Sequence, residues 1–415
     1  MMRSLFSAIS GLRNHMVYMD VVGNNIANVN TTAFKSNRVT FMDALGQTLR
    51  GAGAPQGGLG GTNPVQVGLG MFLGGTDTMH TQGSLTATGK ITDFAIQGDG
   101  FFILNDGNRN FYSRDGAFDV AVNGDLVNPV TGLKVMGWNA DATGAVDLTQ
   151  PLQVLRIPFG TGMAASQSSN IALSGNLDAS TPTAGTVSST VNVYDSLGGL
   201  HTVTLTFTKN AAANTWDITL AENDPAITSL VFSTGSPTQL VFNSSGQLTT
   251  PANGNIQVDL VYSNGAANQT TTINFSDVTQ YVQDAQLITS ANDGFAPGSL
   301  VTFSVSKSGV ITGMFTNGAT QTLGQLALAN FTNPAGLGKI GNNLYETTAN
   351  SGQPLVGTPN TGGRGVVTSG NLEGSNVDLA REFTNVIIAQ RGFQSNSRVI
   401  TASDEMLQDL VNIKR

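Results

Sequence analysis

Few side chains in this sequence stand where they could carry out chemistry. The chain has three histidines, His15, His80 and His201, which lie far apart, and it has no cysteine. No group of ligands therefore has the spacing of a transition-metal site. The G-x-S-x-G pattern of a nucleophile elbow is also missing from the sequence. These observations predict no catalytic residues, no metal ion and no cofactor, so we do not expect an enzyme.

The segment "GSLTATGK", residues 83–90, has some likeness to a phosphate-binding loop. Five residues separate its glycines where that loop needs four. In addition, Ile91 stands where a serine or threonine would hold magnesium. We therefore interpret this segment as a turn between strands.

Carboxylates are dense between residues 99 and 125. Each stands beside or near Gly, Asn or Arg, in patterns such as "DGNRN" and "RDG" that are typical of hairpin turns. A calcium loop needs oxygen ligands at alternate positions and a closing glutamate, which this stretch lacks. We predict turns and no calcium site at Asp99, Asp106, Asp115, Asp119 and Asp125.

The charge of the chain limits its partners. Charged residues make up 11% of the 415 residues and the formal net charge is −8. The longest basic run is Lys414-Arg415, so the clustered cations that nucleic acid requires are missing. We expect no nucleic acid partner, and a surface covered mainly by neutral polar side chains.

Apolar runs are short throughout. No stretch approaches the roughly 20 apolar residues of a membrane span, which predicts no membrane insertion. Near the N-terminus, Ser7, Ser10 and Arg13 interrupt the apolar core that a secretory signal peptide would need. If the protein is exported, the export machinery recognises a signal other than a secretory signal peptide.

Both ends of the chain have the hydrophobic period of helices. The spacing of apolar residues alternates between four and three, which is typical of coiled coils. The stripe of the first segment is Leu5, Ile9, Leu12, Met16, Met19 and Ile26, and that of the last segment is Leu379, Phe383, Val386, Phe393, Ile400, Leu407 and Val411. Ser375 and Asp378 stand where they could cap the second helix, and Lys414 and Arg415 suit its end.

The stripes allow three interpretations: an intramolecular core, a helix on a membrane surface, or an assembly interface. Few cations lie on the polar face, which disfavours the membrane. Isolated helices of this kind are marginal in water, so the stripes must be buried. Because the middle of the chain has a core of its own, we favour burial between subunits that polymerise.

Between the helices the period changes to two. Val203, Leu205 and Phe207 alternate with threonines, as a half-buried strand requires, and similar alternation begins at Trp216, Ile256 and Val301. Turn formers such as "SLGG" and "KSG" bound these strands. The segment from Arg50 to Gly70 is too rich in glycine to form a core. The fold class is therefore mainly β, with helical, coiled-coil-like termini.

The stretch "GNNIANVNT", residues 23–31, ends the first helix with unusually many asparagines. A packed Asn costs stability but fixes the register of helices, because a slipped partner leaves its amide unsatisfied. Asn28 and Asn30 also suit a helix exit, where Asn adopts the left-handed conformation. The two roles can divide among these residues.

Residues 7–36, "SAISGLRNHMVYMDVVGNNIANVNTTAFKS", resemble the N-terminal signature of the bacterial flagellar rod and hook axial protein family. The matching positions are Ser10, Gly11, Leu12, Asp20, Val21, Gly23, Asn24, Asn25, Ile26, Ala27, Asn28, Thr31, Phe34 and Lys35. The C-terminal segment is similar to the family's last helix, notably at "AQRGFQSNS". "GDGFFIL" resembles part of the first β domain. Ala33 departs from the family, which usually has Gly at this position; Ala tolerates a positive φ poorly.

The resemblance implies nested domains of barrel-like or sandwich-like β structure. We expect a helical inner-core domain of residues 1–30 and 372–415, a Gly-rich linker of 31–71, a discontinuous β domain of 72–149 and 282–371, and an inserted outer β domain of 150–281. The insertion contains "VNVYDSLGGLHTVTLTFTKN", which resembles the "VYDS.G" strand of hook subunits. Rod subunits are shorter, so the hook is favoured and the distal rod is the alternative. An extracellular β-rich adhesin is a further alternative, from another class.

By this resemblance the chain is expected to be a structural subunit that polymerises into a flexible hollow tube, a universal joint between motor and filament. Its expected partners are other copies of itself, the distal rod protein, the hook cap and the hook–filament junction proteins. The expected location is the extracellular hook, reached through the flagellar type III export apparatus without a cleaved signal peptide. The predicted assembly interface consists of the two stripes together with Asn24, Asn25, Asn28 and Phe34.

Overall fold

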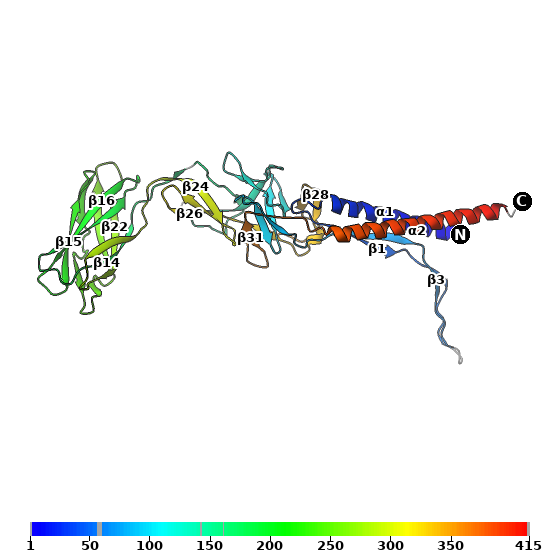
Figure 1. Cartoon of the computed structure of the whole chain (residues 1–415), viewed down its shortest axis with the longest axis horizontal. Helices are drawn as coiled ribbons and strands as arrows, with labels where there is room; N and C mark the ends of the chain where they lie inside the picture. The colour runs from blue at the N-terminus through cyan, green and yellow to red at the C-terminus, as the bar shows by residue number, and fades with distance from the viewer. Residues whose placement is uncertain (1, 56–59, 142, 161, 413–415) are drawn as a thin grey trace. The chain divides into compact units, whose positions relative to one another are not determined.

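The computed structural model describes residues 2–55, 60–141, 143–160 and 162–412 (Figure 1). The chain divides into two compact units. Unit 1 consists of Met1–Ile157, Phe303–Thr312 and Thr322–Arg415, and unit 2 consists of Pro158–Thr302 and Gly313–Gln321. The fold is mainly β with a helix at each end of the chain, as the sequence predicts.

The two helices are α1 (Met2–Ala27) and α2 (Leu379–Asn412). Asp378 caps α2, because its Oδ1 accepts hydrogen bonds from the amides of Ala380 and Arg381, at 3.0 and 3.3 Å. The predicted closing cations Lys414 and Arg415 lie outside the described residues.

After α1, unit 1 continues with paired strands that begin in the stretch predicted as a Gly-rich linker. The strands β1 (Asn37–Asp43) and β4 (Met71–Thr78) pair antiparallel, and β2 (Gln47–Arg50) pairs with β3 (Val65–Val67). We call the β1–β4 and β2–β3 pairs the arm. Both pairs are antiparallel and have few buried side chains.

The β body of unit 1 is built around β7 (Phe101–Asn105), which pairs with β8 (Asn110–Ser113), β11 (Lys134–Asn139) and β27 (Leu328–Asn330). Its core contains Phe101, Ile103, Tyr112, Trp138 and Tyr345. The other strands of this part are β5 (Leu85–Ala87), β6 (Phe94–Gln97), β9 (Asp119–Val120), β10 (Leu126–Val127), β12 (Gln153–Val154), β28 (Gly338–Gly341), β29 (Leu344–Glu346), β30 (Leu355–Gly357), β31 (Val366–Ser369) and β32 (Asn371–Glu373).

Two strands near the end of the chain pair with strands from an early part of it. β31 pairs with β6 and β32 pairs with β5, so the segment that leads into α2 is paired with residues 85–97. A short 3₁₀ helix, Pro334–Gly336, lies between β27 and β28. Strands β24 (Gly298–Val305), β25 (Val310–Phe315) and β26 (Thr320–Leu326) contain residues of both units.

Unit 2 contains two five-stranded sheets that share one core. One sheet has the order β15-β16-β17-β19-β20 and the other β18-β21-β22-β14-β23. Their bounds are β14 (Asn170–Asn176), β15 (Thr186–Tyr194), β16 (Leu200–Lys209), β17 (Thr215–Glu222), β18 (Ile227–Phe232), β19 (Gln239–Phe242), β20 (Leu248–Thr250), β21 (Asn255–Tyr262), β22 (Gln269–Thr279) and β23 (Gln286–Asn292); β13 (Gly162–Met163) pairs with β24.

The alternation in β16 explains this packing. Val203, Leu205 and Phe207 are buried in the shared core, and the threonines between them point to the other face of the sheet. The same pattern holds in β17 and β21. Unit 2 is thus a sandwich with apolar inner faces and mainly neutral polar outer faces.

Candidate assembly surface

Helices α1 and α2 pack antiparallel, side by side (Figure 1). Gly11 faces Asn396, and His15 faces Gly392. A Cβ atom on Gly392 would lie 2.5 Å from the His15 ring, and one on Gly11 would lie 2.7 Å from Asn396 Nδ2. Glycine is therefore what permits this close approach of the two helices. We call this contact the seam.

Small residues, more than the large apolar ones, are buried along the seam. The most buried side chains of the two helices include Ala8, Val22, Ala389 and Ser403. The predicted stripes lie at its margin. Leu5, Leu12, Met19 and Ile26 of α1, and Val386, Phe393, Ile400 and Leu407 of α2, are half-buried, whereas Ile9, Met16, Leu379, Phe383 and Val411 are exposed.

Further large apolar side chains of the helices face solvent, although they lie outside the predicted stripes. Ile387 is 57% exposed and Ile388 is 55% exposed. The same is true of Phe6, Val399, Met406 and Leu410. In the sequence these residues could have been recognised because they are apolar at positions that a single 4–3 stripe assigns to the polar face of the helix. The antiparallel pair of α1 and α2, which we call the helical hairpin, thus presents large apolar side chains to solvent.

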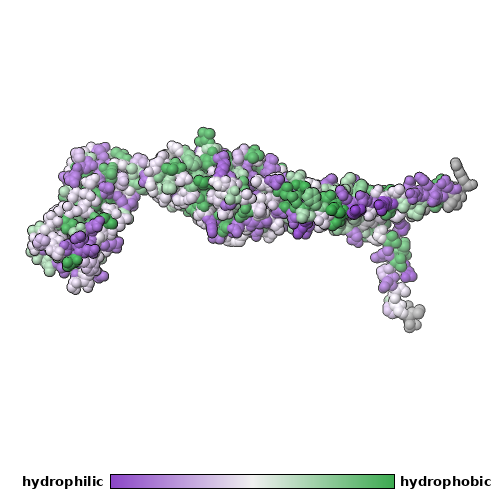
Figure 2. All heavy atoms as spheres, in the orientation of Figure 1, coloured by the Kyte–Doolittle hydropathy of each residue, from purple (hydrophilic) through white to green (hydrophobic). Residues whose placement is uncertain are grey.

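The arm adds apolar surface of its own. The exposed apolar side chains on it are Phe41, Met42, Leu45, Leu49, Val65, Val67, Leu69, Phe72 and Leu73. Figure 2 shows hydrophobic residues gathered on the arm near β3. A two-stranded ribbon is marginally stable in water. The arm therefore needs a covering surface as much as the helices do.

The asparagines at the end of α1 have partners within the chain. Asn25, which is 1% exposed, donates from Nδ2 to the Asn37 carbonyl at 2.9 Å and accepts from the Asn37 amide at 3.0 Å. Asn28 donates to Asn24, and its Oδ1 accepts from the Thr31 hydroxyl at 3.0 Å. Asn25 therefore joins the helix to β1, and Asn28 closes the last turn. The exposed Asn24 is the acceptor of that closing bond.

The left-handed residue after α1 is Ala33, with φ of 56°. The expected left-handed conformation at Asn28 or Asn30 is wrong, since neither has a positive φ. The Asn28 side chain bonds back into the last turn instead, so it needs no αL geometry. Ala33 is buried, and its amide donates to the Glu373 carbonyl at 2.7 Å. The contact with β32 explains why the chain holds alanine in this conformation.

A buried ionic cluster lies beneath the helices. Lys35 Nζ is 2.6 Å from Glu373 Oε1 and donates to the Thr81 carbonyl at 2.7 Å, and both charged side chains are fully buried. Arg114 Nη1 lies 3.9 Å from Glu373 Oε2. Burial lowers the pKa of Lys35, against the opposing effect of the Glu373 charge. The cluster joins Lys35, which precedes β1, to Glu373 at the end of the last strand, β32.

Phe34, another predicted interface residue, is buried beside this cluster. It is 4% exposed, and Lys339 Nζ lies 4.3 Å from its ring centroid. Asn25 and Phe34 are thus inside the monomer, whereas most stripe residues are at its surface. The assignment of the whole set to an interface between subunits stays a prediction.

His80 lies near the cluster without an ionic partner. Its ring is 5.5 Å from that of Phe101 and 5.4 Å from that of Tyr345. Neither ring nitrogen has a hydrogen-bond partner among the described residues. Burial, aided by the charges of Lys35, Arg114 and Lys339, lowers the pKa of His80 to about 4. The ring is therefore neutral and acts as part of the core.

The carboxylates of the predicted turns have different roles. Asp106 accepts from the amides of Asn108 and Arg109, which confirms a turn there. The turn predicted at Asp119 is wrong, because Asp119 lies in β9, where it pairs with Lys90. Asp125 pairs with Lys134 and Arg156. The segment 83–90 contains β5 and the start of the turn that leads to β6.

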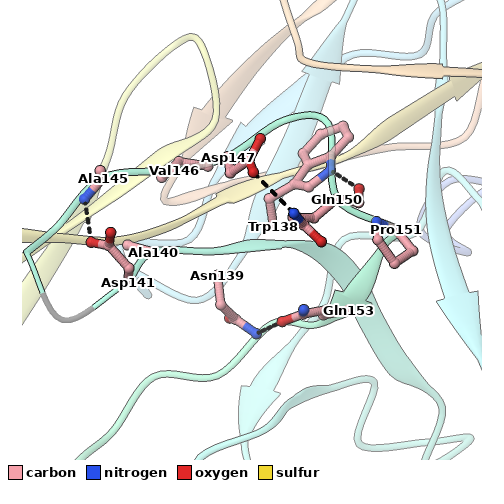
Figure 3. Close-up of a pocket in the computed structure, with 10 residues that line it drawn as sticks. All are labelled: Trp138, Asn139, Ala140, Asp141, Ala145, Val146, Asp147, Gln150, Pro151 and Gln153. Carbon is pink, nitrogen blue, oxygen red and sulfur yellow. Dashed lines mark hydrogen bonds between the residues drawn. The ribbon is translucent and has the colours of Figure 1, made fainter.

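A cavity of about 340 Å³ in unit 1 lies beside Trp138 (Figure 3). Asp141 accepts from the Ala145 amide, and Asp147 accepts from the Gln150 side chain. The Trp138 indole donates to the Gln150 carbonyl at 3.0 Å. Each of these polar groups thus forms a hydrogen bond within the loops that line the cavity. Within the described part of the chain, no three His, Cys, Asp or Glu side chains gather as a metal site.

The described helices include none that is long and apolar enough to cross a membrane. Large apolar side chains of the helical hairpin and of the arm are exposed in the described part of the chain.

Family models match four segments of the chain. Residues 5–35 match the flagella basal body rod protein model, and residues 95–179 match the flagellar hook protein FlgE/F/G D1 domain. Residues 164–295 match the flagellar basal body protein FlaE D2 domain, and residues 368–413 match the flagellar basal body rod FlgEFG protein C-terminal model. Together these segments include both helices and most of the β structure.

Curated relatives match over the full length. The flagellar hook protein FlgE of Borreliella burgdorferi is 38% identical, with all of both chains covered. That of Salmonella typhimurium is 36% identical over 99% of this chain and all of its own. The flagellar basal-body rod protein FlgG of Bacillus subtilis is 32% identical over all of both chains.

The solved structure of the Helicobacter pylori flagellar hook protein FlgE2 is similar in fold. It has a TM-score of 0.53 and 15% identity, and the match covers 69% of this chain and all of that one.

Proposed function

The chain belongs to the flagellar hook protein family and is a structural subunit of the hook, and from this premise we propose how its surfaces serve polymerisation. The helical hairpin and the arm pack against neighbouring copies and hold the lattice. Unit 2 slides against its counterparts in neighbouring copies. The assembled tube then bends while it transmits torque, as a universal joint.

The observation that carries this proposal is the apolar surface of the helical hairpin. The seam uses glycine and small residues, so it buries little of the large side chains of either helix. Each exposed Ile, Leu or Phe gains roughly 1.5–3 kcal/mol when it is fully buried. Neighbouring subunits are the natural source of that burial, since a hairpin that served only the monomer would turn these residues inward.

The outer faces of unit 2 support the sliding part of the proposal. The outward residues of β15 and β16 are neutral, and they include Ser188, Thr190, Thr204 and Thr206. Such faces form neither long-lived ion pairs nor large apolar contacts with a neighbour. A contact of this kind can shift without a large change in free energy.

Export and further partners complete the proposal. We infer that the subunit travels through the flagellar type III apparatus without a cleaved signal peptide and lies outside the cell. At its ends the polymer contacts the distal rod protein, the hook cap and the hook–filament junction proteins. A distal rod subunit is the second candidate, supported by the relative from Bacillus subtilis, but the higher identities are with hook proteins.

The proposal is tested by changing exposed isoleucines to glutamine. Ile387→Gln and Ile388→Gln on α2 should together raise the concentration needed for tube formation by about tenfold or more, because each removes roughly 1 kcal/mol of interface burial. The matched control is Ile288→Gln in unit 2, where Ile288 is 54% exposed. Electron microscopy and sedimentation measure assembly.

Monomer melting should stay unchanged in all three variants, because the side chains are exposed. Tubes that form at the parental concentration from Ile387→Gln/Ile388→Gln would refute the proposed role of the hairpin. Loss of tubes in the Ile288→Gln control alone would place the lattice contact in unit 2 instead.

A further inference from the structure

One histidine of unit 2 lies between two carboxylates. His201 is the second residue of β16 and is 4% exposed. Its Nε2 is 3.0 Å from Asp195 Oδ2, and its Nδ1 is 2.8 Å from Asp224 Oδ2. Both distances are hydrogen-bond distances, so each ring nitrogen faces an acceptor.

Asp195 is held as an anion by its own surroundings. Its Oδ1 accepts from the amides of Leu197 and Gly199, and its Oδ2 accepts from Asn264 at 2.7 Å as well as from His201. Burial alone would raise the pKa of Asp195, but these hydrogen bonds outweigh it and lower that pKa. An ionised carboxylate has no proton to donate to the ring.

Asp224 is also an acceptor. Its Oδ1 accepts from the Ala226 amide at 2.9 Å, and its side chain is 24% exposed. The Ala226 bond, followed by the bond to His201, lowers the pKa of Asp224. A neutral imidazole has only one N–H, so it would turn a lone pair toward one of the two carboxylates.

From this geometry we propose that His201 is an imidazolium, and that its proton is a structural element that staples the β15–β16 hairpin to the connection that leads into the other sheet of unit 2. The ring belongs to the β15–β16 sheet, whereas Asn264 and Tyr262 belong to the β21–β22 side of the other sheet. The Tyr262 ring stacks on it, with centroids 4.7 Å apart and an interplanar angle of 33°. Asp224 lies in the connection between the sheets, from β17 to β18.

The consequence is that the stability of unit 2 depends on pH. Removal of the proton at higher pH leaves one ring nitrogen facing a carboxylate with a lone pair, so one of the two hydrogen bonds is lost and unfolding becomes easier. The groups that face His201 are Asp195, Asp224 and Tyr262, and burial raises the pKa of Tyr262, which therefore stays neutral.

The direct test is the charge state of the ring. In the full chain labelled with ¹⁵N-histidine, NMR should show two protonated nitrogens for His201 at about pH 7, with its signals assigned by their loss in His201→Gln. The other two rings, His15 and His80, serve as internal references. A nitrogen of His201 with a free lone pair at that pH would overturn the proposal.

A second test follows stability. Trp138→Phe leaves Trp216, which is fully buried in unit 2, as the one tryptophan that reports unfolding. In this background the urea midpoint should fall between about pH 6 and pH 9, with the unfolding constant rising by up to about tenfold per pH unit. Asp224→Asn should remove much of this change, and it retains a folded unit because Asp224 is partly exposed.

The matched control is Asp259→Asn. Asp259 accepts hydrogen bonds from Ser233 and Thr270 in the same unit and has no contact with His201. The Asp259→Asn variant should keep the parental dependence of stability on pH. An Asp224→Asn variant that also keeps the parental dependence would overturn the staple, whether or not His201→Gln folds.

Discussion

At the scale of single residues, the side-chain amides of asparagines form the hydrogen bonds at the C-terminal end of α1. Asn25 occupies both backbone groups of Asn37, whereas Asn28 bonds only to its own last turn and to Thr31. The two residues have the same type and lie three positions apart, but one is buried and the other is not. Their replacement should therefore have different effects.

We expect Asn25→Leu to destabilise unit 1 by about 2 kcal/mol, because it removes the buried Asn25 amide that pairs with both the N–H and the C=O of Asn37. Asn28→Leu should cost less than about 1 kcal/mol, since solvent can replace the lost bonds. Urea unfolding followed by far-UV circular dichroism measures both. Equal effects of the two changes would contradict the distinction drawn from burial.

His80 predicts an acid limit for unit 1. The pKa of its ring is lowered to about 4 in the folded chain, from 6.5 in the unfolded chain. The neutral ring is thus favoured by folding, so its stabilisation is complete above about pH 6.5 and is lost as the pH falls toward 4. The shift corresponds to about 3 kcal/mol at low pH.

We expect His80→Phe to remove this part of the acid destabilisation, since phenylalanine packs against Phe101 and Tyr345 without a proton to gain. Urea midpoints at pH values from about 7 to 4 measure it. His15→Phe is the control, because it keeps the pH dependence of stability that the carboxylates of the chain contribute. An unchanged acid slope in His80→Phe would contradict the assignment.

At the scale of elements, the seam depends on glycine. Gly392 and Gly23 are both helical glycines, but only Gly392 has a neighbour where its Cβ would be, and Gly23 has nothing within 4 Å of that position. Either change to alanine gains up to about 1 kcal/mol of helix propensity.

We expect Gly23→Ala to raise the melting temperature of the helices and Gly392→Ala to lower it, because the added methyl pushes the His15 ring out of the seam. Far-UV circular dichroism of the monomer measures the melting, and electron microscopy measures assembly. A Gly392→Ala variant as stable as Gly23→Ala would show that the helices tolerate a wider seam.

Sequence periodicity predicts the elements better than their pairing. The alternation at Val203, Leu205 and Phe207 is local, and these residues do lie in a strand. The 4–3 stripes likewise predict both helices. The seam itself was not predicted, because it joins Gly11 to Asn396 through small residues, and a stripe of large apolar residues does not indicate them. Ala33 illustrates a further limit: its positive φ is imposed by a distant partner, Glu373.

At the scale of the whole molecule, assembly and β structure should be separable. Removing residues 379–415 deletes α2 but leaves Glu373 and the ionic cluster, so the β cores of both units stay intact. We expect a folded protein that does not form tubes. Tryptophan fluorescence and circular dichroism measure the fold, and electron microscopy measures the tubes. Tubes from the truncated chain would show that α2 is dispensable for the lattice.

The antiparallel pairing of α1 with α2 has a kinetic consequence. About 350 residues separate the two helices, so the contact between them has a very high sequence separation. Closing so long a loop is slow and entropically costly until the intervening β structure has shortened it. The helical hairpin should therefore be the last part of the monomer to form. A chain that is still folding then lacks the surface on which other copies add, and premature association during synthesis is avoided by topology alone.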